Sequence, residues 1–146
     1  MASLADKENV PAAVIARGQQ HETILVVEDD AEVRALTTTM LEGLGYRVVS
    51  TASIAEARIM VIAQRPALLL TDVMLPGGNG RELADAALRK VPNLKVLFMS
   101  GHADSVNLHM GRPDQQPNLL QKPFRQHDLA LKVRAVLDGD SAVVRG

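Results

Sequence analysis

Runs of aliphatic residues alternate with segments in which apolar residues recur at helical spacing along most of this chain. The predominantly apolar stretches at 24–27, 67–71 and 95–99 are typical of strands that are covered on both faces. Shorter runs predict two more strands at 46–50 and 119–120. Apolar spacing and capping signals between these runs predict helices at 33–44, 53–64, 81–90, 103–110 and 129–137.

Local signals mark where several of these helices begin and end. Ser53 and Glu56 form a capping box, in which the serine oxygen accepts an early helical amide and the glutamate reaches back to the cap amide. Pro66 ends this helix, and the glycine-rich segment 76–80 predicts a turn before the next one.

Five strands that alternate with five helices define the expected fold class. Parallel strands need helical crossovers, which are nearly always right-handed and cover both faces of the sheet. We therefore predict an α/β fold with a doubly wound, five-stranded parallel sheet of the flavodoxin-like strand order 2-1-3-4-5. Ligands in such folds bind beyond the carboxyl ends of the strands.

Composition narrows the class of protein further. The 146 residues suit one domain, expected at 23–138, with a flexible arm at 1–22 and a short tail at 139–146. The net charge of −1 argues against direct binding to nucleic acid. No apolar run is long enough to cross a bilayer, and no signal peptide is evident, so we expect a cytoplasmic protein without membrane insertion. The absence of cysteine excludes thiolate chemistry.

Polar residues follow four of the predicted strands. Glu28 and Asp29 end the first strand, Asp72 the third, Ser100 the fourth and Lys122 the fifth. Three carboxylates at one edge of a sheet repel one another unless a cation joins them, and Mg²⁺ prefers such oxygen ligands. A plainer interpretation of single residues is that Asp29 or Asp30 caps a helix and Asp72 begins a turn. The joint pattern favours a cation site.

Four stretches then carry a resemblance to a known family. Segments 24–30, 70–76 with Gly80, 96–101 and 121–124 resemble the receiver domain of two-component response regulators, in order and spacing, over residues 23–138. The resemblance implies that a histidine kinase or a histidine phosphotransfer protein donates a phosphoryl group to Asp72. It implies a signalling domain that catalyses only its own phosphorylation and dephosphorylation.

The resemblance also implies a role for each matching residue. Asp72 is similar to the phosphoacceptor, Asp29 to the direct metal ligand, Glu28 to the acid that holds metal-bound water, and the backbone carbonyl of Met74 to the main-chain ligand. The implied cofactor is Mg²⁺, with Mn²⁺ as an alternative. Lys122 and the hydroxyl of Ser100 would contact phosphoryl oxygens, which is where charge develops during the transfer.

The sequence departs from the family pattern at two kinds of position. Leu119 stands where many relatives have an aromatic switch residue, so the usual switch is absent. Met74 and His102 stand where side chains modulate the attacking water, and Gly101 leaves access open. An apolar Met74 predicts slow self-dephosphorylation, whereas a solvated loop histidine is the plainer interpretation of His102. The expected partner surface includes Val106, Met110, Leu119 and the loop 112–118.

The sequence leaves several kinds of protein open as alternatives. The short stretch after the last predicted helix is expected to leave no room for a DNA-binding or catalytic output domain, which favours a free-standing regulator with an unknown downstream protein partner. A receiver from a hybrid histidine kinase is the main alternative. An aspartyl-nucleophile phosphatase needs a second acid where Met74 stands, and an FMN-binding flavodoxin-like protein needs a phosphate loop that the acidic segment 28–30 does not supply.

Overall fold

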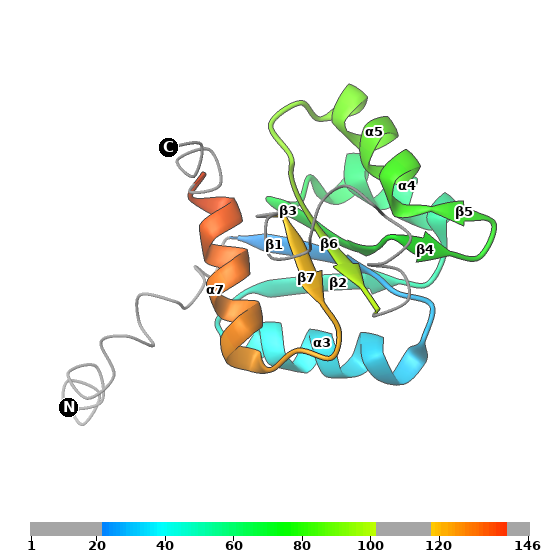
Figure 1. Ribbon diagram of the computed structural model, residues 1–146. Helices are drawn as coiled ribbons and strands as arrows, with labels where there is room; N and C mark the ends of the chain where they lie inside the picture. Colours follow the sequence, from blue (N-terminus) through cyan, green and yellow to red (C-terminus); the bar gives the residue numbers. More distant parts are fainter. Residues whose placement is uncertain (1–21, 102–117, 140–146) are drawn as a thin grey trace.

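The computed structural model describes residues 22–101 and 118–139, and its centre is a five-stranded parallel sheet (Figure 1). Neighbouring strands lie in the order β2-β1-β3-β6-β7, which confirms the predicted doubly wound topology. The strands are β1 (Thr23–Val27), β2 (Arg47–Thr51), β3 (Leu68–Asp72), β6 (Lys95–Ser100) and β7 (Leu119–Gln121).

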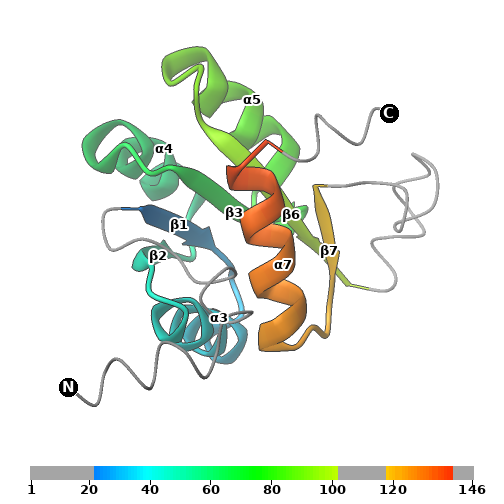
Figure 2. The ribbon, with the colours of Figure 1, turned by 90° about the vertical axis from the view of Figure 1, so that its left-hand side faces the viewer.

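Four described helices cover the two faces of this sheet. Helices α4 (Ile54–Gln64) and α5 (Gly80–Lys90) lie on one face, and α3 (Ala31–Gly43) and α7 (Gln126–Leu137) lie on the other (Figures 1 and 2). Side chains alternate between the faces along β1. Ile24 and Val26 are buried against the α3–α7 side, and Leu25 and Val27 against the α4–α5 side. The unbroken apolar run of a covered parallel strand follows from this alternation.

Each of the five strands differs from its predicted range by one residue at one end or at both ends. Strand β2 begins at Arg47 because the amide of Tyr46 is still bonded to the carbonyl of Leu41, in the turn that ends α3. Strand β3 extends to Asp72, so this acid is the last residue of a central strand. The predicted helix at 103–110 lies outside the described residues.

The predicted capping box at α4 is only half correct. The Ser53 hydroxyl accepts the amide of Glu56 at 3.1 Å, as expected. The cap amide of Ser53 donates to the Thr51 hydroxyl at 3.1 Å, and that hydroxyl in turn donates to the Glu56 carboxylate. Thr51 thus stands between the two members of the box, because it lies at the end of the preceding strand. The helix ends before Pro66, as predicted.

A short hairpin, absent from the predictions, links β3 to α5. It consists of β4 (Met74–Leu75) and β5 (Gly78–Asn79). Gly80 follows at a close approach of two backbone segments: a Cβ atom there would lie 2.0 Å from the carbonyl oxygen of Asp72. The Gly80 amide also donates to the carbonyl of Val73 at 2.7 Å. This glycine therefore lets the start of α5 pack directly against the end of β3.

Candidate functional site

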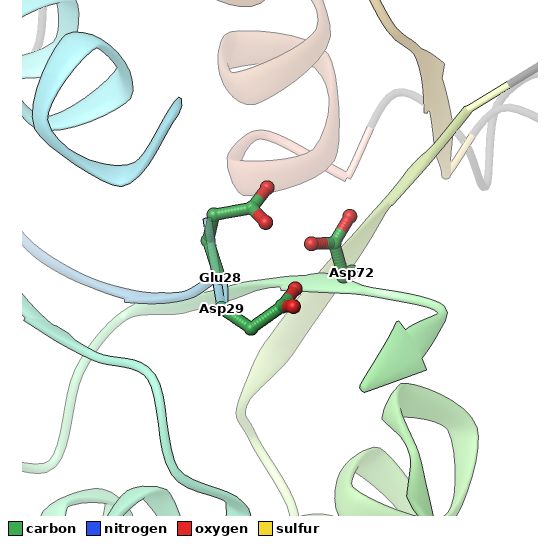
Figure 3. A group of neighbouring side chains, drawn as sticks. All are labelled: Glu28, Asp29 and Asp72. Atoms are coloured by element: carbon green, nitrogen blue, oxygen red, sulfur yellow. The ribbon is translucent and has the colours of Figure 1, made fainter. Parts of the chain in front are cut away.

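The carboxyl ends of β1 and β3 bring three acidic side chains together. Figure 3 shows the carboxyl groups of Glu28, Asp29 and Asp72 directed toward one another. One carboxylate oxygen from each of the three lies within 4.8 Å of the others. Glu28 and Asp72 are almost fully buried, at 1% and 3% exposure, whereas Asp29 is exposed. The cluster therefore has a closed inner side and one side open to solvent.

Lys122 supplies the positive charge of this cluster. Its Nζ lies 2.8 Å from Oδ1 of Asp72 and 3.0 Å from Oε1 of Glu28. The residue is placed by a backbone hydrogen bond from its amide to the carbonyl of Ser100, at 2.7 Å, and its peptide bond to Pro123 is cis. One ammonium group thus bridges two buried carboxyl groups that come from different strands.

Glu28 is held by its own neighbours as well as by Lys122. Its second carboxylate oxygen accepts the amide of Asp30 at 3.0 Å, and its carbonyl accepts a hydrogen bond from the guanidinium of Arg34 at 2.8 Å. Its amide donates to the carbonyl of Thr51 at 3.1 Å. These bonds fix both the backbone and the carboxylate of Glu28 before any ligand arrives.

The pKa values of the neighbouring Asp72 and Glu28 carboxyl groups shift in opposite directions. Burial raises the pKa of Asp72 to about 8, and the adjacent Glu28 carboxylate adds to that rise while Lys122 opposes it. Burial also acts to raise the pKa of Glu28, but bonds from Asp72, the Asp30 amide and Lys122 hold it below its usual value. Burial acts to lower the pKa of Lys122, but the two carboxyl groups raise it. Without a metal, the proton therefore resides on Asp72 and Lys122 stays charged.

The donor set fits a hard divalent cation. All three clustered side chains offer carboxylate oxygens, the ligand type that Mg²⁺ and Mn²⁺ prefer. Burial, reinforced by the adjacent Glu28 carboxylate, raises the pKa of Asp72 more than Lys122 lowers it, so Asp72 is driven toward its neutral form when no cation is bound. Asp29 is exposed, so the cluster is open to solvent on that side.

The remaining residues singled out from the sequence lie in different surroundings. Ser100 is fully buried, and its hydroxyl donates to the carbonyl of Gly101 at 3.1 Å. Met74, two residues after Asp72, is 53% exposed, and Leu119 is buried in the same apolar cluster as Phe98. His102, Val106, Met110 and the loop residues 112–117 lie outside the described residues.

Sequence reasoning missed two residues that position the cluster. Arg34 secures the carbonyl of Glu28 from the first turns of α3. The hydroxyl of Thr71, fully buried, donates to the carbonyl of Asp72 at 2.9 Å. A basic residue six positions after a strand-end acid is a usable signal for the first contact. No pattern signals the second, because it depends on the local path of the backbone.

The turn after β1 argues against a nucleotide or flavin phosphate at that position. Oδ1 of Asp30 accepts the amides of Glu32 at 2.9 Å and Val33 at 3.1 Å. The amino end of α3 is thus capped by a carboxylate, which occupies the amides that would otherwise bind a phosphate group. Of the two candidate capping residues after β1, the structure selects Asp30 and leaves Asp29 in the acidic cluster.

Comparisons with known proteins agree with this architecture. The family model of the response regulator receiver domain matches residues 24–134. The DNA-binding response regulator MtrA of Mycobacterium tuberculosis is 32% identical over 114 residues, which cover 78% of this chain and 50% of MtrA. This chain therefore spans about half the length of the curated relatives it matches.

Solved structures show the same fold. The receiver domain of the hybrid histidine kinase CckA matches with a TM-score of 0.64 and 29% identity, over 79% of this chain and 98% of that domain. A response regulator receiver protein of Sinorhizobium medicae matches with a TM-score of 0.68 and 28% identity, over 80% of this chain and 94% of that one.

The doubly wound sheet with acids at its carboxyl edge defines a flavodoxin-like α/β domain with a candidate cation site. The chain belongs to the response regulator receiver domain family. Receiver domains of this family bind Mg²⁺, and the acidic cluster is a fitting place for it. Among the described helices, none has the length and apolar character that a membrane span requires.

Proposed function

We propose that this receiver accepts a phosphoryl group on Asp72 from a histidine kinase or a histidine phosphotransfer protein, in a reaction that depends on Mg²⁺. The observation that carries the proposal is the bridge from Lys122 to Asp72 and Glu28 beside the open side of Asp29. It combines a carboxyl nucleophile with a fixed positive charge and a cation site, which is what attack on an anionic phosphoryl group needs.

Asp72 and Lys122 have different roles in the proposed phosphoryl transfer. An oxygen of Asp72 bonds to phosphorus while the bond from phosphorus to the donor imidazole nitrogen breaks. That nitrogen keeps the electron pair and takes up a proton, so the donor histidine leaves in its neutral form. Lys122 already lies 2.8 Å from Asp72 and would move with its charge onto a phosphoryl oxygen.

The acidic residues would hold the cation. Asp29 and Asp72 would bind Mg²⁺ directly, with the backbone carbonyl of Met74, and Glu28 would accept hydrogen bonds from its water ligands. A bound Mg²⁺ supplies positive charge to the phosphoryl oxygens. It also favours the ionised form of Asp72, which is the form that attacks phosphorus and which burial alone disfavours.

Ser100 would couple phosphorylation to a conformational change at the edge of the sheet. Its hydroxyl now donates to the neighbouring Gly101 carbonyl, and a phosphoryl oxygen is a stronger acceptor. Redirecting this hydroxyl would draw the segment after β6 inward. The proposed output surface lies along β7 and the segment that precedes it in sequence. Leu119, expected from the sequence to belong to that surface, is buried in the core and does not form part of it.

The wider setting of the domain is also a proposal. We propose receiver boundaries at 23–138, a flexible arm before them and a tail after them, in a cytoplasmic protein whose downstream partner is a protein rather than nucleic acid. The near-neutral net charge supports the last point. The likeness to the CckA receiver supports a hybrid kinase setting equally well.

Phosphorylation by a small donor tests this proposal directly. With Mg²⁺ and acetyl phosphate, the intact mass should rise by about 80 Da, the mass of one phosphoryl group. Asp72→Asn should abolish the increase, whereas Asp85→Asn, at an exposed acid on α5, should leave it unchanged. Labelling that persists in Asp72→Asn would overturn the assignment, and so would labelling that persists after chelation of Mg²⁺.

A further inference from the structure

Helix α4 exposes two large apolar side chains on its outer side, next to the exposed Arg58. Ala57 and Val61 are buried against the sheet, as the inner side of such a helix requires. On the outer side, Ile59 is 68% exposed and Ile62 is 49% exposed. Two neighbouring isoleucines this exposed on one helix form an apolar patch of the kind that marks an interaction site.

Two hollows meet at this surface. One, of about 790 Å³, is lined by Ala52, Ser53, Ile54, Ala55, Arg58, Ile59, Pro76 and Gly77. The other, of about 200 Å³, lies between α4 and α5, which are neighbours in Figure 1, and is lined by Arg58, Ile59, Val61, Ile62, Ala86, Ala87 and Lys90. Because both hollows share Arg58 and Ile59, they form one continuous feature, here named the α4 trough.

The charge of the α4 trough restricts what it can accept. Its only charged lining residues are Arg58 and Lys90, both cations. A second copy of the chain, docked face to face, would bring these like charges together, which is unfavourable. A fitting occupant has an apolar run for Ile59 and Ile62 and acidic residues for the cations.

We propose that the amino-terminal segment of this same chain, residues 4–16, occupies the α4 trough. This segment contains an apolar run at 10–16, and just before it Asp6, Lys7 and Glu8 carry a net charge of −1. Apolar residues would cover Ile59 and Ile62 while the acids approach Arg58. The segment therefore offers both features that the trough requires.

The described chain begins close to the trough. The carbonyl of Thr23 accepts the amide of Ala67 at 2.8 Å, and Ala67 follows the end of α4 after only two residues. Five residues, 17–21, separate the apolar run from Glu22, and five extended residues span about 17 Å. This reach is about the length of an 11-residue helix such as α4. Such tethering gives an effective concentration in the millimolar range, so a small contact suffices.

A spin label tests this contact in the full chain, because the protein contains no cysteine that would compete for the label. We would introduce Ala5→Cys, attach a nitroxide and record amide signals of the ¹⁵N-labelled protein without metal or phosphodonor. Signals of Arg58, Ile59 and Ile62 should lose about half or more of their intensity relative to a diamagnetic label, as a largely occupied tethered contact predicts. The measurement is independent of Asp72, so it can fail while the proposed phosphorylation stands.

Matched variants separate docking from chance proximity. Ile59→Gln with Ile62→Gln, or Arg58→Glu, should restore the signals of the trough. Leu36→Gln with Leu131→Gln removes equally exposed apolar residues from the opposite face, and Arg47→Glu reverses an exposed charge on β2; both should leave the signal loss intact. Signal loss spread over the surface or confined to the α3–α7 face overturns the proposal. Loss that appears only when labelled chains are mixed with ¹⁵N chains overturns it in favour of contact between copies.

Discussion

Lys122 and Asp72 meet at 2.8 Å although 49 residues separate them in the sequence, and the same ammonium reaches Glu28 at 3.0 Å. The lysine thus links the end of central strand β3 to the segment after edge strand β7. Its charge is in place before any phosphoryl group arrives, so the protein needs no large rearrangement to assemble the site.

Replacing this lysine should impair the transfer and spare the cation site. We expect Lys122→Met to slow phosphorylation by acetyl phosphate about 100-fold, because a fixed charge on the transferred group is lost. Mg²⁺ binding, measured by calorimetry, should persist because the three carboxyl groups remain. Lys132→Met, on α7, is the matched control. A phosphorylation rate equal to that of the wild type would contradict the role of Lys122.

Asp72 should make the metal-free protein less stable as the pH rises. Its pKa of about 8 in the folded protein exceeds the value of about 4 in an unfolded chain. Its contribution is therefore fully present below about pH 4 and is lost as the pH rises through about 8. Glu28 shifts in the opposite direction, so its contribution is present above its unfolded pKa and is lost only in acid.

The corresponding variant is Asp72→Asn, which removes the ionisation. In a chelating buffer at pH 8 we expect its free energy of unfolding to exceed that of the wild type by about 1 to 3 kcal/mol. The difference should shrink toward pH 5, as measured by urea denaturation at several pH values. Asp85→Asn should follow the wild-type pH dependence. A constant difference across this range would show that the ionisation of Asp72 is not its cause.

Binding of Mg²⁺ should displace the proton from Asp72. We expect the affinity for Mg²⁺ to fall as the pH drops from 8 to 6, because proton and cation compete for the same carboxylate. Calorimetry in two buffers of different ionisation enthalpy measures the proton release. Asp29→Asn should weaken the binding about tenfold or more, and Asp30→Asn should not, because Asp30 caps α3 instead.

Gly80 should tolerate no side chain. A Cβ atom there meets the Asp72 carbonyl at 2.0 Å and the Thr71 hydroxyl at 3.0 Å. We expect Gly80→Ala to lower the free energy of unfolding by about 2 to 4 kcal/mol, since the backbone must shift. Gly78→Ala is the control, because its Cβ meets the end of the Ile54 side chain at 3.0 Å, which can move. Equal stability of the two variants in urea would contradict this account.

Met74 should set a slow rate of self-dephosphorylation. Its apolar, half-exposed side chain cannot orient a water molecule for attack. Met74→Asn supplies a hydrogen-bonding group there and should speed the loss of the phosphoryl group about tenfold, measured by intact mass after removal of the donor. Leu131→Asn, at an equally exposed residue of α7, should leave the rate unchanged.

The strands were predictable because buried parallel strands need unbroken apolar runs, as β1 and β3 have. The residues at the strand ends were predictable for the same reason, since topology then places them at one edge. The helical pattern was less informative: Leu36 belongs to the apolar spacing of α3 but is 56% exposed. Contacts that depend on tertiary geometry escaped prediction, among them the bond from Thr51 to Glu56 and that from Arg34 to Glu28.

The backbone around Asp72 has a consequence for how a signal would leave the site. Asp72 ends a strand that is paired on both sides, and its carbonyl is confined by the Thr71 hydroxyl and by Gly80. Strand β7 is three residues long and, within the part of the chain that the structure describes, pairs only with β6. The proposed phosphoacceptor therefore lies in the centre of the sheet, Ser100 ends the neighbouring strand β6, and Lys122 follows the edge strand β7. We expect phosphorylation to change the conformation of β7 and of the segment that follows it, while the centre of the sheet keeps its shape.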